Sequence, residues 1–397
     1  MIEFAEAAFS LAGFLAWPRP LEVALPYRAV VLDADGVRGI APAAWDGLAS
    51  NALECNPWLS RQMVLAGLDA LEAKAGYHAL ALYKADSDEL IGFLPFRVRG
   101  FGPLAVGRPA LNLYQVGGTP LISRKHTPLA LTGLLQMMAA GQQIPRRWMF
   151  PHVALDGMFR ERLTVKAERA GLDVGVAAVY QRPVLRRDAE DFSDHVATVV
   201  GKKRAKDIER NLRRLAQEGT VEFERVSEPQ AVAARVEDFL RIEASGWKGK
   251  RGTAFLSRPR DASFARRAYG GMPDAAGLAS VDSLLLDGKP IAISINISTG
   301  QTLFAPKCAF DERYRKFGPG MVLEYKVIEA FFAEDAHSEM DAATTVDDHI
   351  ISELWGKTRP MGTLVVGPAG LATRGLASSI DVAAKARTWL KRIFRRG

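Results

Sequence analysis

The chain has 397 residues, of which 48% are hydrophobic and 24% charged, and its formal net charge at pH 7 is +7. This length and apolar content suffice for two ordinary hydrophobic cores, so two or three domains are expected. No apolar run reaches the roughly 18 residues that a membrane-spanning helix needs. Cys55 and Cys308 are too few for a disulfide framework and have no metal-like spacing to histidine, so we expect two buried thiols and no metal site.

An apolar stretch at residues 7–17 opens the chain. Glu3 and Glu6 precede it, where a secretion signal would carry basic residues. We therefore expect a cytoplasmic protein.

The first half predicts a hairpin followed by further strands and helices. Its strands are residues 78–84 and 90–98, joined by a polar turn. A strand-like run, a helix at 128–140, a strand at 148–152 and a helix at 157–170 follow. Residues 181–194 are rich in charge and contain Pro183, which indicates a connection and a domain boundary.

Residues 201–215 predict a strongly basic helix, with seven basic and two acidic residues. Its apolar stripe is thin and consists of Ile208, Leu212 and Leu215. The segment is interpreted either as a solvated helix face or as a site for phosphate groups or an anionic membrane surface. Nucleic acid is not expected as a partner, because no aromatic residues are interleaved.

A second hairpin is predicted at residues 281–286 and 290–298, around the turn Asp287-Gly288. Isoleucine alternates with small or polar residues along its second strand, which indicates one buried face. The next strand, 301–310, contains Pro306, which cannot donate a ladder hydrogen bond and so predicts an edge or a bulge. The same order of hairpin, strand and helix in both halves indicates an internal duplication, the alternative being an unrelated α/β domain in the first half.

The sequence Arg-Lys-Phe-Gly-Pro-Gly at residues 315–320 lies between this strand and an amphipathic helix at 321–332. Glycines let backbone N–H groups approach an anion closely, and the helix directs its N-terminus to the same place. Arg315 and Lys316 add full charges. The string predicts a pyrophosphate site, and the alternative is a simple turn that opens the helix. A strand at 339–343, a helix opened by Asp347 and Asp348, and a strand at 362–366 follow.

Four features together resemble a known family. They are Glu-Ala-Ser-Gly-Trp-Lys at 243–248, Ala-Phe-Asp-Glu-Arg-Tyr at 309–314, the glycines at 318–320, and Asp341 followed by Trp355. Residues 193–368 resemble CelD/BcsL-type acetyltransferases of the GNAT superfamily, distant relatives of the Fem-type aminoacyl transferases, which pair two GNAT-like domains.

The resemblance implies a fold, a cofactor and a set of domains. The fold is α/β, with tandem GNAT-like domains that each have a mixed, mostly antiparallel sheet flanked by helices. The expected ranges are 1–185 for a degenerate first domain, 193–370 for the domain that binds acyl-coenzyme A, and 378–397 for a C-terminal helix. The strand before the loop should bulge and separate from its neighbour to admit the thioester arm. The residues implied to hold the cofactor are Arg315, Lys316, Phe317, Gly318, Pro319 and Gly320.

The implied chemistry is direct attack of an amine on a thioester, for which a carboxylate or histidine would serve as general base. Glu243 is the first candidate, followed by Asp311, Asp348 and His349. Trp247 and Lys248 are candidates for substrate binding. Each base candidate also has a structural interpretation: Glu243 as a surface carboxylate, His349 as a half-buried helix residue, and Asp311 and Asp348 as caps. A covalent route through Cys308 is disfavoured, because no histidine lies near it in sequence.

Residues 380–397 predict one amphipathic helix that is typical of a membrane interface, the alternative being a helix docked on the protein itself. Its apolar side carries Val382, Ala383, Ala386, Trp389, Leu390, Ile393 and Phe394, and its other side carries Lys385, Arg387, Lys391, Arg392, Arg395 and Arg396. This tail favours a lipid amine as acceptor, such as a sphingoid long-chain base in ceramide synthesis, and a peripheral place at the inner membrane face. The alternatives are acetylation of a sugar in exopolysaccharide or cellulose synthesis and a noncatalytic membrane-associated scaffold.

Overall fold

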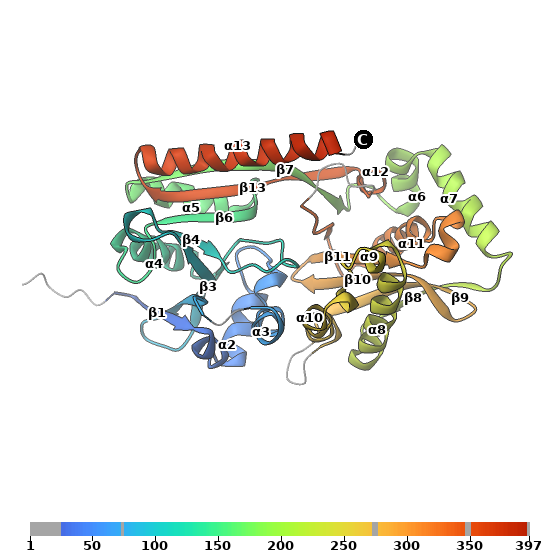
Figure 1. Ribbon diagram of the computed structural model, residues 1–397, viewed down its shortest axis with the longest axis horizontal. Coiled ribbons are helices and arrows are strands. Elements are labelled where there is room, and N and C mark those ends of the chain that lie inside the picture. The colour runs from blue at the N-terminus through green and yellow to red at the C-terminus, as the bar shows by residue number, and fades with distance from the viewer. Residues whose placement is uncertain (1–24, 73–74, 272–276, 346–350, 395–397) are drawn as a thin grey trace, which may run out of the picture.

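We describe the protein from a computed structural model, which defines residues 25–72, 75–271, 277–345 and 351–394 (Figure 1). Its strands form one 13-stranded sheet in the order β1-β2-β3-β4-β6-β13-β7-β12-β11-β10-β9-β8, and β5 pairs with β3. Helices flank this sheet, and most neighbouring strands are antiparallel. The predicted α/β class is confirmed.

The first half of the chain builds one end of the sheet. Its elements are β1 (Tyr27–Asp33), α1 (Ala34–Arg38), α2 (Pro42–Ser50), η1 (Pro57–Leu59), α3 (Arg61–Ala70), β2 (His78–Lys84), β3 (Leu90–Arg99), η2 (Gly102–Leu104), β4 (Val106–Pro109), β5 (Leu121–Ile122), α4 (Thr127–Ala140), β6 (Arg147–Ala154), α5 (Met158–Arg169) and β7 (Leu172–Arg186).

The second half builds the other end. Its elements are α6 (Phe192–His195), η3 (Val196–Val200), α7 (Lys202–Leu215), β8 (Val221–Val226), α8 (Pro229–Ser245), α9 (Trp247–Lys250), η4 (Phe255–Ser257), α10 (Pro259–Gly270), β9 (Ala279–Leu286), β10 (Lys289–Thr299), β11 (Thr302–Phe310), η5 (Glu312–Phe317), α11 (Pro319–Ala333), β12 (Glu339–Asp341), α12 (Ser352–Trp355), β13 (Lys357–Pro368) and α13 (Leu371–Phe394).

The two halves repeat one order of elements. Each has an antiparallel hairpin (β2–β3 and β9–β10), a further antiparallel strand (β4 and β11), a helix (α4 and α11), and then a strand that pairs in parallel with that further strand (β6 with β4, and β12 with β11). In the first half, the short strand β5 comes between β4 and α4. This repetition agrees with the tandem arrangement that the sequence predicted.

The hairpin of the second half forms as its sequence predicts. Asp287 and Gly288 both have positive φ, 50° and 72°, which suits a tight hairpin turn. The predicted irregularity at Pro306 is also confirmed. The register between β10 and β11 shifts there, because Ile295 pairs with Lys307 whereas Ile297 pairs with Phe304.

Two strands connect the halves in a way that the sequence did not indicate. Residues 181–186, expected to start a connection, are the end of β7, which pairs with β12 of the second half. The last strand, β13, does not join β12; it lies between β6 and β7 (Figure 1). The ranges 1–185, 193–370 and 378–397 remain a prediction of domain boundaries.

An apolar core also links the halves. Trp58 of η1 and Met63 of α3 belong to the same buried cluster as Phe255 and Phe264 of the second half. The Gln62 side chain donates a hydrogen bond to the Ala268 carbonyl at 3.0 Å. The two halves therefore share one packed apolar cluster.

The C-terminal helix α13 lies along β7 and β13 (Figure 1). Asp381 accepts a hydrogen bond from the Ala178 N–H at 3.2 Å, and a Cβ on Gly175 would lie 3.0 Å from Ala377. Further along the helix, Val382 and Trp389 are 66% and 63% exposed. Within the described ranges, no helix is long and apolar enough to span a membrane.

Candidate active site

The loop before α11 has the geometry of an anion site. Gly318 has φ of 57° and caps the helix, a conformation that favours glycine. A Cβ on Gly320 would lie 3.4 Å from the Phe310 ring, so a side chain at this position would contact that ring. Arg315 is exposed, and its charge lies at the positive end of a 15-residue helix.

The other predicted cofactor residues have mixed positions. Lys316 is exposed and lies 3.4 Å from Glu218. Phe317 and Pro319 are buried in the core, so only their backbones face the loop. These two side chains support the turn and do not form the surface that a cofactor would meet.

The basic helix α7 approaches the same loop. A Cβ on Gly318 would lie 3.5 Å from the side-chain nitrogen of Asn211, and the Arg214 guanidinium lies 5.4 Å from the centre of the Phe317 ring. Ala205, Ile208 and Leu215 are the buried residues of α7. The charge of α7 therefore lies beside the loop that the sequence predicts to bind pyrophosphate, as the phosphate interpretation of this helix requires.

The strands beside this loop separate after a short parallel contact. β11 pairs with β12 only where residues 302–304 meet 339–341, while its pairing with β10 continues to Phe310. In the described ranges, the edge of β11 beyond Phe304 that faces away from β10 has no strand partner. A free strand edge offers backbone groups to an extended ligand, as the resemblance implies for the thioester arm.

Glu243, Trp247 and Lys248 come together at the end of β11. They line a small cleft with Cys308 and Phe310. The Glu243 carboxylate is 6% exposed and accepts hydrogen bonds from Lys248 Nζ at 2.7 Å and from the Phe255 N–H at 2.9 Å. Glu243 is thus buried and paired, unlike the surface carboxylate of its alternative interpretation.

The other predicted bases lie elsewhere or outside the described ranges. Asp311 caps η5 and pairs with Arg313 at 2.6 Å, and this hydrogen bonding holds the pKa of Asp311 below its usual value. Asp348 and His349 lie outside the described residues. Cys308 is exposed at the cleft, so its predicted burial is wrong, while Cys55 is half-buried.

A buried carboxyl that the sequence did not single out lies one turn into α11. Glu324 accepts a hydrogen bond from the Trp355 indole N–H at 2.7 Å, and burial raises the pKa of Glu324 to about 7. This hydrogen bond gives the buried Trp355 indole a structural role: it satisfies the indole N–H against α11. The signal in the sequence was a glutamate on the apolar face of the helix, four residues after Gly320.

Lys307, on β11 just after the bulge, was also missed. Its ammonium lies 4.9 Å from the Tyr114 ring centre and 5.2 Å from that of Phe255, so aromatic rings of both halves hold it. Burial, with the nearby Lys248 charge, lowers the pKa of Lys307 to about 8.

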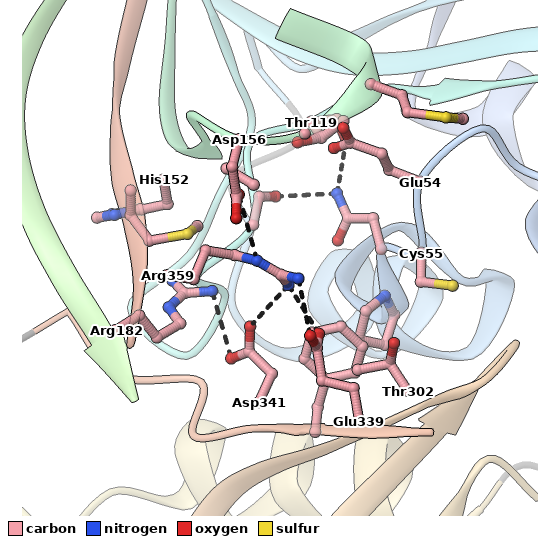
Figure 2. Close-up of a pocket in the computed structure, with 18 of the residues that line it drawn as sticks. Glu54, Cys55, Thr119, His152, Asp156, Arg182, Thr302, Glu339, Asp341 and Arg359 are labelled. Atoms are coloured by element: carbon pink, nitrogen blue, oxygen red, sulfur yellow. Dashed lines mark hydrogen bonds and ion pairs between the residues drawn. The ribbon is translucent and has the colours of Figure 1, made fainter. Parts of the chain in front are cut away.

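A polar pocket of about 420 Å³ lies between the halves, where β11 and β12 begin (Figure 2). Arg359 of β13 lies at its centre, 2.8 Å from Glu339, 3.4 Å from Asp156 and 3.9 Å from Asp341. The pocket is lined by four arginines and four carboxylates: Arg124, Arg182, Arg186, Arg359, Glu54, Asp156, Glu339 and Asp341. Its formal charge is therefore balanced.

His152 contributes a neutral imidazole to this pocket. It has φ of 57°, a strained value for a residue other than glycine. Arg182 donates to the Tyr180 hydroxyl at 2.9 Å, and that hydroxyl lies 3.1 Å from His152 Nδ1. Burial and the Arg182 charge lower the pKa of His152 to about 4, so the ring carries no charge at neutral pH.

Glu54 is the pocket carboxylate that no arginine pairs with in the described structure. It accepts the Phe159 N–H at 2.7 Å, at the start of α5, and burial raises its pKa. A desolvated carboxylate with an unused oxygen is suited to bind a cationic or hydrogen-bond-donating group. No group of His, Cys, Asp and Glu within the described ranges could hold a metal ion.

Residues 202–349 match the sequence model of the acetyltransferase (GNAT) domain. No curated protein sequence matches the chain. Among solved structures, FemX is 10% identical over 86% of this chain and 98% of its own, with a TM-score of 0.55. A conserved protein of unknown function from Bacteroides thetaiotaomicron VPI-5482 is 12% identical over 83% of this chain and 98% of its own, with a TM-score of 0.52. L-PGS from Bacillus licheniformis is 11% identical over 87% and 96%, with a TM-score of 0.49.

The likeness to FemX and to the Bacteroides protein extends over both halves and concerns the fold. The family match covers the part of the chain that contains the loop, α11 and the separated strands. The second half therefore contains a segment that matches the GNAT domain model, within a fold that is similar to that of FemX.

Proposed function

We propose that the chain is an acyl-coenzyme A-dependent N-acyltransferase in which an amine attacks the thioester directly. The observation that carries the proposal is the glycine-capped N-terminus of α11, which lies beside the separated edge of β11 inside the region matched by the GNAT model. Arg315 and the α7 residues Asn211 and Arg214 would bind the pyrophosphate. Acyl-coenzyme A would supply the activated carbonyl.

The polar pocket is suited to the acceptor amine. Thr302 and Phe304 of β11 line it, and the two strands separate directly after Phe304 and Asp341. The pocket therefore adjoins the place proposed for the thioester. Two carboxylates are alternative bases: Glu54 for an amine held in the polar pocket, and Glu243 for an amine that enters the cleft at the opposite end of β11.

A lipid amine, such as a sphingoid base in ceramide synthesis, is the favoured acceptor. The support is α13, whose residues Val382 and Trp389 remain exposed although the first part of the helix is docked. Sugar acetylation in polysaccharide synthesis is the second candidate, because the polar pocket would also suit a hydroxylated substrate. A noncatalytic scaffold would not need to bind coenzyme A.

Gly320→Val is expected to weaken coenzyme A binding about 10- to 100-fold. The added branches would stand where a phosphate oxygen must approach the backbone, and a hydrogen bond to a charged group is worth roughly 1.5–3 kcal/mol. Gly47→Val, in the open surface of α2, is the matched control. Isothermal titration calorimetry measures both, and equal affinity in the two folded variants would remove the pyrophosphate assignment.

Deletion of residues 385–397 is expected to release the protein from anionic vesicles and to spare activity on a soluble short-chain amine. Each exposed cation near an anionic surface contributes about 1 kcal/mol. Vesicle sedimentation measures the binding, which high salt should also weaken. The double variant Lys202→Gln, Lys203→Gln removes two exposed charges from α7 and should bind as the intact chain does. Unchanged binding after the deletion would contradict the membrane proposal, and unfolding would favour simple docking.

A further inference from the structure

We propose that a groove between α4 and α5 holds the alkyl chain of the acyl acceptor, and that this acceptor is an anionic amphiphile. The inference rests on the proposed acyltransferase function and narrows its lipid acceptor to an amine that also carries an anionic group, in place of a simple sphingoid base. The groove has a volume of about 590 Å³, which is within the range of small-molecule sites. It is separate from the loop proposed for coenzyme A.

The floor of the groove is apolar. Leu53 and Leu131 are core residues that are 6% and 0% exposed, and Pro128 lies beside them. On α5, Met158 and Val165 are 36% and 45% exposed, and their spacing of seven residues places them on one stripe of the helix. An alkyl chain along this stripe would remove both side chains from water.

The rim of the groove is cationic. Four basic residues and one acidic residue line it: Arg124, Arg162, Lys166, Arg169 and Glu161. Arg124 donates to the carbonyls of Ala52 and Leu53, which fixes its position, and Arg162 is only loosely paired with Glu161 at 3.9 Å. An apolar floor with an excess of positive charge at its edge is complementary to an anionic amphiphile.

The groove continues into the polar pocket. Leu53, Arg124 and Met158 line both spaces. Glu54 follows Leu53 in the chain and accepts a hydrogen bond from Phe159 N–H, so its carboxylate lies at the junction on the pocket side. One ligand can therefore place its chain in the groove, its anionic group against the rim and its amine near Glu54.

The test is a calorimetric titration of the full-length chain with a homologous series of alkyl phosphates, below their critical micelle concentrations and without coenzyme A. The dissociation constant should fall about fourfold for each methylene until the groove is filled. Val165→Glu should weaken binding of the longest phosphate at least roughly tenfold, since it places a charge on the floor. Val98→Glu, an equally exposed valine on β3, is the control and should bind as the parent does.

Absence of chain-length dependence, or equal weakening by the two valine variants, would overturn the proposal. Coenzyme A is titrated into the same proteins, so that retained cofactor binding separates failure of the groove from failure of the acyltransferase assignment. If alkyl alcohols bound as tightly as alkyl phosphates of the same length, the ligand would need no anionic group, and the proposed anionic class of the acceptor would be overturned. A full-length Phe14→Asp variant tests whether the apolar N-terminal segment of the chain occupies the groove instead. If alkyl phosphates bound with chain-length dependence only in this variant, the N-terminal segment would be the occupant, and the proposal would be overturned.

Discussion

Glu243→Gln is expected to lower the turnover rate by roughly 10²–10⁴ while coenzyme A affinity stays within a few-fold of the parent. Lys248 and the Phe255 N–H use two of the approximately four acceptor positions of the carboxylate, which leaves room for an amine that enters this cleft or for a bridging water. Glutamine keeps the shape but cannot take up a proton. Release of free coenzyme A thiol from an acyl-coenzyme A substrate measures the rate.

The control for this prediction is Glu237→Gln, which neutralises an ion-paired carboxylate on the same helix and should leave turnover unchanged. A base also determines the acidic limb of the pH–rate profile, whereas a purely structural residue does not. Asp311→Asn, Asp348→Asn and His349→Gln complete the series. If all four variants turn over at the parental rate across pH, the amine is deprotonated by solvent or by another group.

Glu324→Gln is expected to stabilise the protein above neutral pH by up to about 3 kcal/mol, the free-energy equivalent of the shift of the Glu324 pKa to about 7. The folded state holds this proton more tightly than the unfolded state does. The parent chain therefore loses this stability as pH rises from about 4.5 to about 7, and the difference should vanish at lower pH. Glutamine still accepts the Trp355 N–H.

Thermal unfolding of parent and variant across this pH range measures the effect. Glu329→Gln is the matched control, because Glu329 lies on α11 but its side chain is half-exposed and pairs with Lys326. It should shift the melting temperature little, at any pH. A stabilisation by Glu324→Gln that is the same at low and high pH would show that packing, and not proton binding, is responsible.

The sequence predicted those parts of the fold that depend on local patterns. The alternating isoleucines and the Asp287-Gly288 turn define the β9–β10 hairpin, and Pro306 marks the bulge, because these signals act between neighbouring residues. The position of β13 could not be predicted. Its apolar pattern fits any buried strand, and pairing with β6 and β7 depends on contacts that are distant in sequence.

The candidate site also divides into parts that local sequence motifs predicted and parts that they could not predict. Residues 243–248 and 315–320 are each continuous in the chain, so their motifs could be recognised in the sequence. The polar pocket joins Glu54 and His152 of the first half to Glu339 and Arg359 of the second, so no local spacing could indicate it. The raised pKa of Glu324 likewise depends on burial by the whole core.

The proposed reaction is the transfer of an acyl group from coenzyme A to an amine. Its most direct test is the release of coenzyme A thiol from acyl-coenzyme A of several chain lengths, with and without a panel of lipid, sugar and short-chain amines. Release is expected to depend on the amine in the parent chain and in Gly47→Val, and to be strongly reduced in Gly320→Val. Absence of amine-dependent release together with absence of coenzyme A binding would contradict the proposed function.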